Sequence, residues 1–131
     1  MTEKTDMIRI ERPEDARTAF IDAFDAGDLD GLVNLFKPDA VIILPPDQVV
    51  TGPAEIREII AQVRATWDRW EIKMISHHRV GDIALNTVEH TLQNQRPDGS
   101  TNTLNLRAVV VFRRQPDGSW RFLIDNGVPF A

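Results

Sequence analysis

The chain has 131 residues, no cysteine, a formal net charge of −5, and 42% hydrophobic and 27% charged residues. This length is typical of one domain with a single core, and the absence of cysteine excludes disulfides, thiolate nucleophiles and cysteine-based metal sites. An acidic chain with scattered Lys and Arg argues against nucleic-acid binding, and no apolar run reaches the roughly 18 residues of a membrane helix. The N-terminus is charged, so no signal peptide is visible, and we expect a cytoplasmic protein.

Residues 1–12 are expected to form a flexible lead-in, and residues 13–131 a single domain. Pro13 suits the first position of a helix, and Gly27 suits the position just after its end. Between them, apolar residues recur at spacings of three and four, which predicts one buried helix face. These residues are Ala16, Ala19, Phe20, Ala23 and Phe24.

Two further helices and two short strands follow. Asp28 can cap a short second helix, which we expect to carry Leu32, Val33, Leu35 and Phe36 and to end at Pro38. Residues 41–44 and residues 49–50 predict brief strands. Pro53 then starts a third helix. Its buried stripe comprises Ile56, Ile59, Ile60, Val63 and Trp67.

The rest of the chain predicts four long strands, at residues 71–80, 83–93, 103–114 and 120–125. Gly81 and Asp82 form a two-residue hairpin turn, and residues 116–119 form the last loop. The final hairpin is so apolar that we expect it to lie inside a sheet covered by the helices. The fold class is therefore α+β, with the helices on one face of an antiparallel sheet.

The segments AFIDAFDAGDLDGLVNLFKPDAVIILPP, VVTGPAEIREII, VGDIAL and RRQPDGSWRFLIDN resemble the nuclear transport factor 2-like superfamily, and most of all its SnoaL-like branch. The resemblance implies a cone in which a curved sheet wraps around the N-terminal helices and leaves an apolar pocket. It also implies a homodimer formed through the outer face of the sheet. The superfamily includes ketosteroid isomerases, polyketide cyclases, epoxide hydrolases, dehydratases and binding modules, so membership does not choose a reaction.

Comparison with the isomerases shows that their polar residues are replaced. The isomerase uses an aspartate base with a tyrosine and a protonated aspartate as hydrogen-bond donors. The resemblance aligns Phe20 with the tyrosine, Leu44 with the base and Val110 with the second acid. A proton shuttle by that trio is therefore not expected, although a pocket of similar shape is.

Asp125 is the first candidate catalytic residue. If residues 116–119 form the last loop, Val110 faces Asp125 and Phe112 faces Leu123, which puts Asp125 and Leu123 on the pocket wall. A desolvated carboxyl group there would have a raised pKa suited to acid/base catalysis. The alternative is that Trp120, Phe122 and Ile124 form the inner face, which would put Asp125 outside.

His90 is the second candidate. It alternates with Asn86 and Val88 on a face that the resemblance also places inside, and the turn at Gly81-Asp82 would put His77 opposite Asn86 and Lys73 opposite His90. This patch could transfer protons. The alternative is that His90 is a satisfied polar residue, and a bulge would change the partners of all these side chains.

We expect no metal, because His77 and His78 point to opposite faces of a strand and no HxH or HExxH spacing occurs. We expect no cofactor either, and nothing in the sequence resembles GxGxxG or a P-loop. Trp67 is expected in the pocket, and Asn105, Arg107 and Arg113 on an outer face available to a second subunit. Two functions remain open. The first is a cofactor-free acid/base enzyme of isomerase, cyclase, dehydratase or hydrolase type acting on a small apolar molecule. The second is a non-catalytic ligand-binding or dimerisation module.

Overall fold

A computed structural model describes residues 8–129. A short 3-10 helix, η2 (Pro13–Asp15), leads into α1 (Ala16–Ala26), α2 (Leu29–Val33) and, after two strands, α3 (Gly52–Thr66). The six strands are β1 (Phe36–Leu44), β2 (Gln48–Thr51), β3 (Arg69–Val80), β4 (Ile83–Gln95), β5 (Thr101–Arg114) and β6 (Trp120–Pro129). None of the helices within residues 8–129 is long and apolar enough to cross a membrane.

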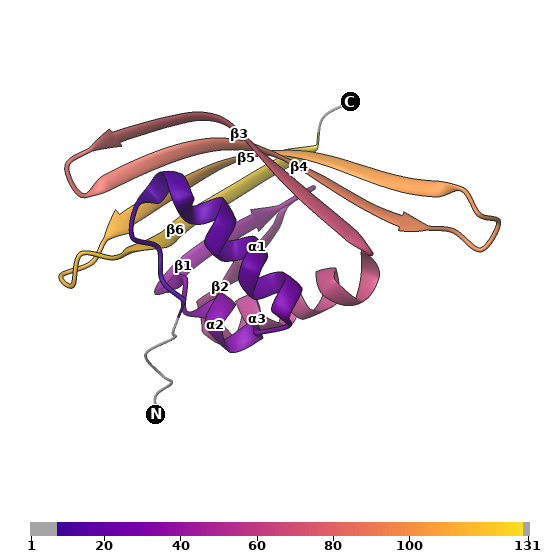
Figure 1. Cartoon of the computed structure of the whole chain (residues 1–131), viewed down its shortest axis with the longest axis horizontal. Coiled ribbons are helices and arrows are strands. Elements are labelled where there is room, and N and C mark those ends of the chain that lie inside the picture. Colours follow the sequence, from indigo (N-terminus) through magenta and orange to yellow (C-terminus); the bar gives the residue numbers. More distant parts are fainter. Residues whose placement is uncertain (1–7, 130–131) are drawn as a thin grey trace.

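The six strands form one curved sheet in the order β2-β1-β6-β5-β4-β3. The helices lie on its concave side, and the β4–β5 hairpin projects beyond them (Figure 1). The last hairpin occupies the centre of the sheet, as its apolar sequence predicts. One pairing was not expected from the sequence: β1 runs parallel to β6, with Ile42 opposite Asp125.

The helix boundaries follow the local signals. Gly27 ends α1 with a φ of 71°, a left-handed conformation that glycine adopts without steric cost. The Asp28 carboxylate then accepts a hydrogen bond from the Gly31 amide at 2.9 Å and caps α2. At the start of α3, the Glu55 side chain accepts a hydrogen bond from the Thr51 amide at 3.0 Å.

The end of the second helix was predicted wrongly. It stops at Val33, and β1 begins at Phe36 and runs through Pro38. Proline is tolerated there because the register of β1 against β6 shifts between Phe36 and Val41. Phe36 therefore packs from a strand, with its ring stacked on Phe122 at a centroid distance of 4.5 Å.

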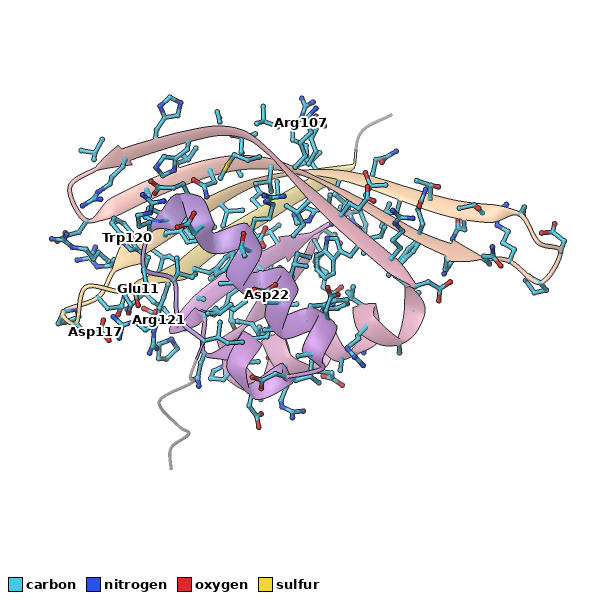
Figure 2. The ribbon with its side chains drawn as sticks, viewed as in Figure 1. Glu11, Asp22, Arg107, Asp117, Trp120 and Arg121 are labelled. Carbon is cyan, nitrogen blue, oxygen red and sulfur yellow. The ribbon has the colours of Figure 1, made fainter. Side chains whose placement is uncertain are left out.

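The segment before η2 packs against the start of β6. Residues 1–7 of the expected lead-in lie outside the described residues, whereas Ile10 within it is 1% exposed and forms a β-bridge with Trp120. The guanidinium of Arg79 covers the Trp120 ring at 4.8 Å. Trp120, Glu11 and Asp117 lie together at this end of the sheet (Figure 2). Ile10 thus closes one end of the core.

Candidate functional site

A cavity of about 350 Å³ lies between the inner face of the sheet and the helices α1 and α3. Its volume falls at the lower end of the range of small-molecule sites. Most of the wall is aliphatic or aromatic, and the exceptions are Arg17, Gln48, Asn86, His90 and Asp125. A few polar groups in an apolar cavity are typical of a ligand site.

Six of the seven residues expected around the pocket line this cavity. They are Phe20, Leu44, Trp67, Asn86, Val88 and Val110. Phe20, Leu44 and Val110, which the resemblance aligns with the polar residues of the isomerase, are therefore part of the wall. Leu123 does not line the cavity, and the reason lies in the register of β6.

A β-bulge in β6 decides which of its residues face inward. At the hairpin end Arg114 faces Trp120 and Phe112 faces Phe122, so the pairing expected between Phe112 and Leu123 is wrong. The register then shifts by one residue, with Leu123 as the extra residue. A bulge reverses the alternation of faces along a strand.

The two interpretations of β6 are consequently each correct for one half of the strand. Trp120 and Phe122 are buried at 2% and 6% exposure, as the apolar alternation predicts. Beyond the bulge, Ile124 is 38% exposed, while Asp125 faces Val110 and lines the cavity.

Asp125 contributes a carboxyl group to the cavity wall. No hydrogen bond or ion pair joins its side chain to any other residue between positions 8 and 129. Its side chain is half-buried, and it contributes to the cavity wall. Desolvation raises the pKa of Asp125 from 3.8 to about 6, because the charged form loses its water without gaining a donor.

The space beside Asp125 results from two small residues. Gly127 and Ala108 face each other across β6 and β5, two residues further along from Asp125 and Val110, and both line the cavity. A Cβ added to Gly127 would meet only the Ile43 carbonyl oxygen, at 3.8 Å, and its φ lies outside the left-handed range. The backbone thus has no need of glycine here, and its absent side chain leaves room in the cavity.

A bulge in β3 also changes the expected partners of His90. His77 faces Asn86 as predicted, but the register shifts between Met74 and Ser76. Ile72 is consequently the residue opposite His90, and Lys73 faces Glu89 instead. The expected patch of Lys73 and His90 therefore does not form.

Asn86 connects the sheet to the N-terminal segment. Its side chain is 2% exposed, and its amide nitrogen donates to the Pro13 carbonyl at 3.0 Å. Its amide oxygen lies 2.6 Å from Nδ1 of His77. Asn86 thus makes two hydrogen bonds within the protein, which favours a structural role for it beside the cavity.

His90 lies further along β4 and is hydrogen-bonded to Trp70. The indole nitrogen of Trp70 donates to Nδ1 of His90 at 2.9 Å. Burial lowers the pKa of His90 from 6.5 to about 4, so the imidazole is neutral at pH 7. Trp70 was not predicted as the partner of His90 from the sequence, although an indole N–H that is withdrawn from water needs an acceptor.

No three His, Asp or Glu side chains within residues 8–129 converge as a metal site requires. The polar groups of the cavity wall instead suit hydrogen bonding and proton transfer.

Residues 18–122 match the family model of the SnoaL-like domain. The chain belongs to the SnoaL-like family. This assignment confirms the superfamily and the cone-shaped α+β fold that the sequence motifs indicated. No curated protein is similar enough in sequence to count as a relative.

Similar solved structures carry different descriptions. A protein provisionally named a dehydratase of the NTF2-like family, from Streptomyces avermitilis, is 25% identical, with a TM-score of 0.73 and coverage of 98% of this chain and 99% of that one. A ketosteroid isomerase-like protein from Erwinia carotovora atroseptica is 17% identical, with a TM-score of 0.76 and coverage of 100% and 99%.

A third structure comes from Thiobacillus denitrificans and is provisionally named a calcium/calmodulin-dependent protein kinase type II association domain. It is 23% identical, with a TM-score of 0.75 and coverage of 94% of this chain and 98% of that one. The fold is thus shared by proteins described as a dehydratase, as ketosteroid isomerase-like and as an association domain, so the function of this chain has to be argued from the cavity itself.

Proposed function

We propose that this protein is a cofactor-free acid/base enzyme that transfers a proton on a small, mainly apolar molecule, with Asp125 as the transferring group. The observation that carries the proposal is a carboxyl group in the wall of an apolar cavity, with no partner among residues 8–129. A pKa of about 6 for Asp125 suits a general acid or base near neutral pH.

The chemistry available to Asp125 is exchange of a proton with a bound carbon or oxygen atom. As a base, the carboxylate takes a proton from a carbon beside a carbonyl group, and the electron pair of the broken C–H bond forms an enolate. The carboxylic acid then returns the proton to the same carbon or to another. Such a step needs no oxidant and no further reactant, and it is common to isomerisation and dehydration.

Deuterium exchange tests this role directly. The protein is incubated in D₂O with a panel of neutral ketones that have acidic α-protons, and proton NMR follows the loss of the α-proton signal. We expect the exchange rate to rise with pH through about 6 and to fall roughly 10²–10⁴-fold in Asp125→Asn. Asp47→Asn is the matched control, because Asp47 is an exposed aspartate outside the cavity wall.

The replacement of the isomerase trio by Phe20, Leu44 and Val110 favours a second candidate, a binding module without chemistry. Ketones that bind to the protein and exchange no faster than in buffer would support this candidate. An exchange rate unchanged by Asp125→Asn would remove Asp125 from the mechanism.

We also propose a homodimer through the outer face of the sheet, the side on which Arg107 projects away from the helices (Figure 2). On that face, Leu85 faces Val111, Val111 faces Ile124, and Val109 lies in the next row with Thr87 and Asn126. These two rows contain no acidic, lysine or arginine side chain on β4, β5 or β6. A two-fold axis through them would bury the same uncharged patch on both subunits.

Sedimentation velocity of the native chain and of Val109→Glu tests the dimer. Val109 is 40% exposed, and a buried glutamate at its position would separate the subunits. Ala65→Glu is the control, because Ala65 is exposed on α3, and the helices lie on the other side of the sheet. A native protein that sediments only as a monomer would refute the proposal.

A further inference from the structure

The cavity has a second polar end, at His90, which the proton transfer by Asp125 does not use. In the register of the sheet, Asp125 faces Val110 and Val110 faces Asn86, and His90 lies four residues beyond Asn86 on β4. Four residues of extended strand span roughly 13 Å, and the two steps across the sheet from β6 to β4 add roughly 10 Å at right angles to the strands. The row between them contains Gly127, Ala108 and Val88, and the first two leave little side-chain volume on β6 and β5 between the two ends.

The hydrogen bond from Trp70 determines which ring nitrogen of His90 carries the proton. An indole N–H is only a donor, so Nδ1 of His90, at 2.9 Å, must be the bare nitrogen of the ring. A neutral imidazole then carries its one proton on Nε2. Turning the ring by 180° would put a carbon opposite the indole N–H and leave that donor without an acceptor.

The indole is itself held in place by two aromatic rings of α1. Phe20 and Phe24 meet Trp70 edge to face, at centroid distances of 5.0 Å and 4.9 Å. The donor is thus held by packing on the neighbouring helix, which makes the orientation of the His90 ring a fixed feature of the site.

The other nitrogen of His90 is free to bind a ligand. Among residues 8–129, no group pairs with Nε2–H, and the His90 ring is part of the cavity wall. A buried donor without an acceptor costs free energy, so this position favours a ligand that supplies an oxygen. A cationic His90 is disfavoured, because burial lowers its pKa to about 4.

We propose that Trp70 fixes His90 as a hydrogen-bond donor, and that the cavity selects elongated molecules with an oxygen acceptor, such as a carbonyl group, at the His90 end. The atom that exchanges a proton lies at the Asp125 end. This inference rests on the proposed function for the presence of a ligand in the cavity. It assigns His90 a role in specificity, and it makes Trp70 a positioning residue.

The first test needs no ligand. Long-range proton–nitrogen NMR of the ¹⁵N-labelled protein distinguishes a bare from a protonated ring nitrogen for each of the three histidines. We expect Nδ1 of His90 to be bare and Nε2 to be protonated at pH 7, and Trp70→Phe to yield a mixture of the two tautomers. A protonated Nδ1 in the native protein would overturn the proposal, whatever binds in the cavity.

The second test compares two probes of the same shape, 2-acetylnaphthalene and 2-ethylnaphthalene, by calorimetry. We expect the native protein to bind the ketone roughly five- to tenfold more tightly than the hydrocarbon, which is the usual value of one hydrogen bond. His90→Leu should remove this preference and Trp70→Phe should reduce it. His78→Leu should leave it unchanged, because His78 is an exposed histidine on the neighbouring strand and does not line the cavity.

Two outcomes distinguish this inference from the proposed function. A preference for the ketone that survives His90→Leu and disappears in Asp125→Leu would place the acceptor at Asp125 and overturn the role of His90. If neither probe binds to the native protein or to Gly127→Val, the result would instead argue against the cavity as a ligand site. In that case the proposed function fails, and the NMR experiment still decides the tautomer.

Discussion

Asp125 on β6 and His90 on β4 face one cavity, two strands apart and four residues apart in the register of the sheet. The same apolar surroundings shift their pKa values in opposite directions, to about 6 for Asp125 and to about 4 for His90, because burial disfavours the charged form of each. Both groups are therefore mainly neutral at about pH 5. Their effects on stability have opposite signs.

Between pH 4 and pH 6 the native protein keeps a proton on Asp125 that the unfolded chain has released, so the free energy of unfolding decreases as the pH rises. Between pH 4 and pH 6.5 the unfolded chain binds a proton at His90 that the native protein lacks, so the free energy of unfolding increases as the pH rises. Each shift of about two pKa units corresponds to about 3 kcal/mol. The two contributions nearly cancel in the native chain.

Single substitutions should reveal each contribution in urea unfolding curves measured from pH 4 to pH 7. In Asp125→Asn we expect the free energy of unfolding to rise by about 3 kcal/mol over this range relative to the native curve. In His90→Leu we expect a fall of similar size, with a constant offset because the Trp70 indole loses its acceptor. Curves for both variants that run parallel to the native curve would show that neither group is desolvated.

The bulge at Leu123 leads to a prediction about deletions. Deletion of Leu123 restores a regular strand in which Phe122 and Asp125 still face inward, so we expect little loss of stability and a pKa of Asp125 that stays raised. Deletion of Arg121 also removes the bulge, but it turns Phe122 out of its contacts with Phe36 and Phe112 and should cost about 3 kcal/mol. Thermal unfolding measures the stability of both deletion variants. Equal losses of stability in the two variants would refute this account of the bulge.

Ile10 should contribute to stability like a residue of the core. It is 1% exposed, forms a β-bridge with Trp120 and belongs to the same core cluster, so Ile10→Ala should lower the free energy of unfolding by about 2–5 kcal/mol. Val128→Ala serves as the control, because Val128 is 54% exposed and a surface substitution usually changes stability by less than about 0.5 kcal/mol. Denaturant unfolding measures both, and a loss for Ile10→Ala as small as that for Val128→Ala would show that the segment before η2 is not part of the core.

Asn86 should be structural and not catalytic. Asn86→Leu removes the donor to the Pro13 carbonyl and the partner of His77, and an unsatisfied buried group costs about 1–3 kcal/mol. Hydrogen exchange should therefore become faster in η2 and at the start of α1. Thr87→Val on the same strand is the control, since Thr87 belongs to the opposite face of β4. Unchanged exchange in Asn86→Leu would show that this amide does not hold the N-terminal segment.

The order of the elements could be read from the sequence because each boundary has a local cause. Gly27 and Asp28 mark the end of one helix and the start of the next, and Gly81 with Asp82 marks a hairpin turn. Pro38 misled the prediction of the second helix, since proline ends helices but is also allowed where a strand is irregular. Pairing between β1 and β6 had no local signal, because it joins segments far apart in the chain.

The orientation of the candidate site residues depended on two bulges that alternation alone cannot reveal. Asp125 lies inside because Leu123 is an extra residue, and Lys73 misses His90 because the register of β3 shifts near Ile75. The partner of Asp125, Val110, was nevertheless predicted correctly. The predicted loop placed Trp120 opposite Gln115 instead of Arg114, an error of one residue in the register. The extra residue at Leu123 shifts the register by one residue in the opposite sense, so the predicted pairing of Val110 with Asp125 was right although the bulge was not foreseen.

The parallel pairing of β1 with β6 also constrains how the chain folds. Ile42 and Asp125 are neighbours in the sheet, although more than eighty residues separate them in sequence. Contacts of such long range slow folding, because the loop between the strands has to be closed before the pairing stabilises it. During synthesis β6 leaves the ribosome after every other described strand, so β1 stays without its central neighbour until then. The apolar residues of β1 therefore lack their partner strand until β6 has been synthesised, and slow translation of β6 should increase aggregation of the nascent chain.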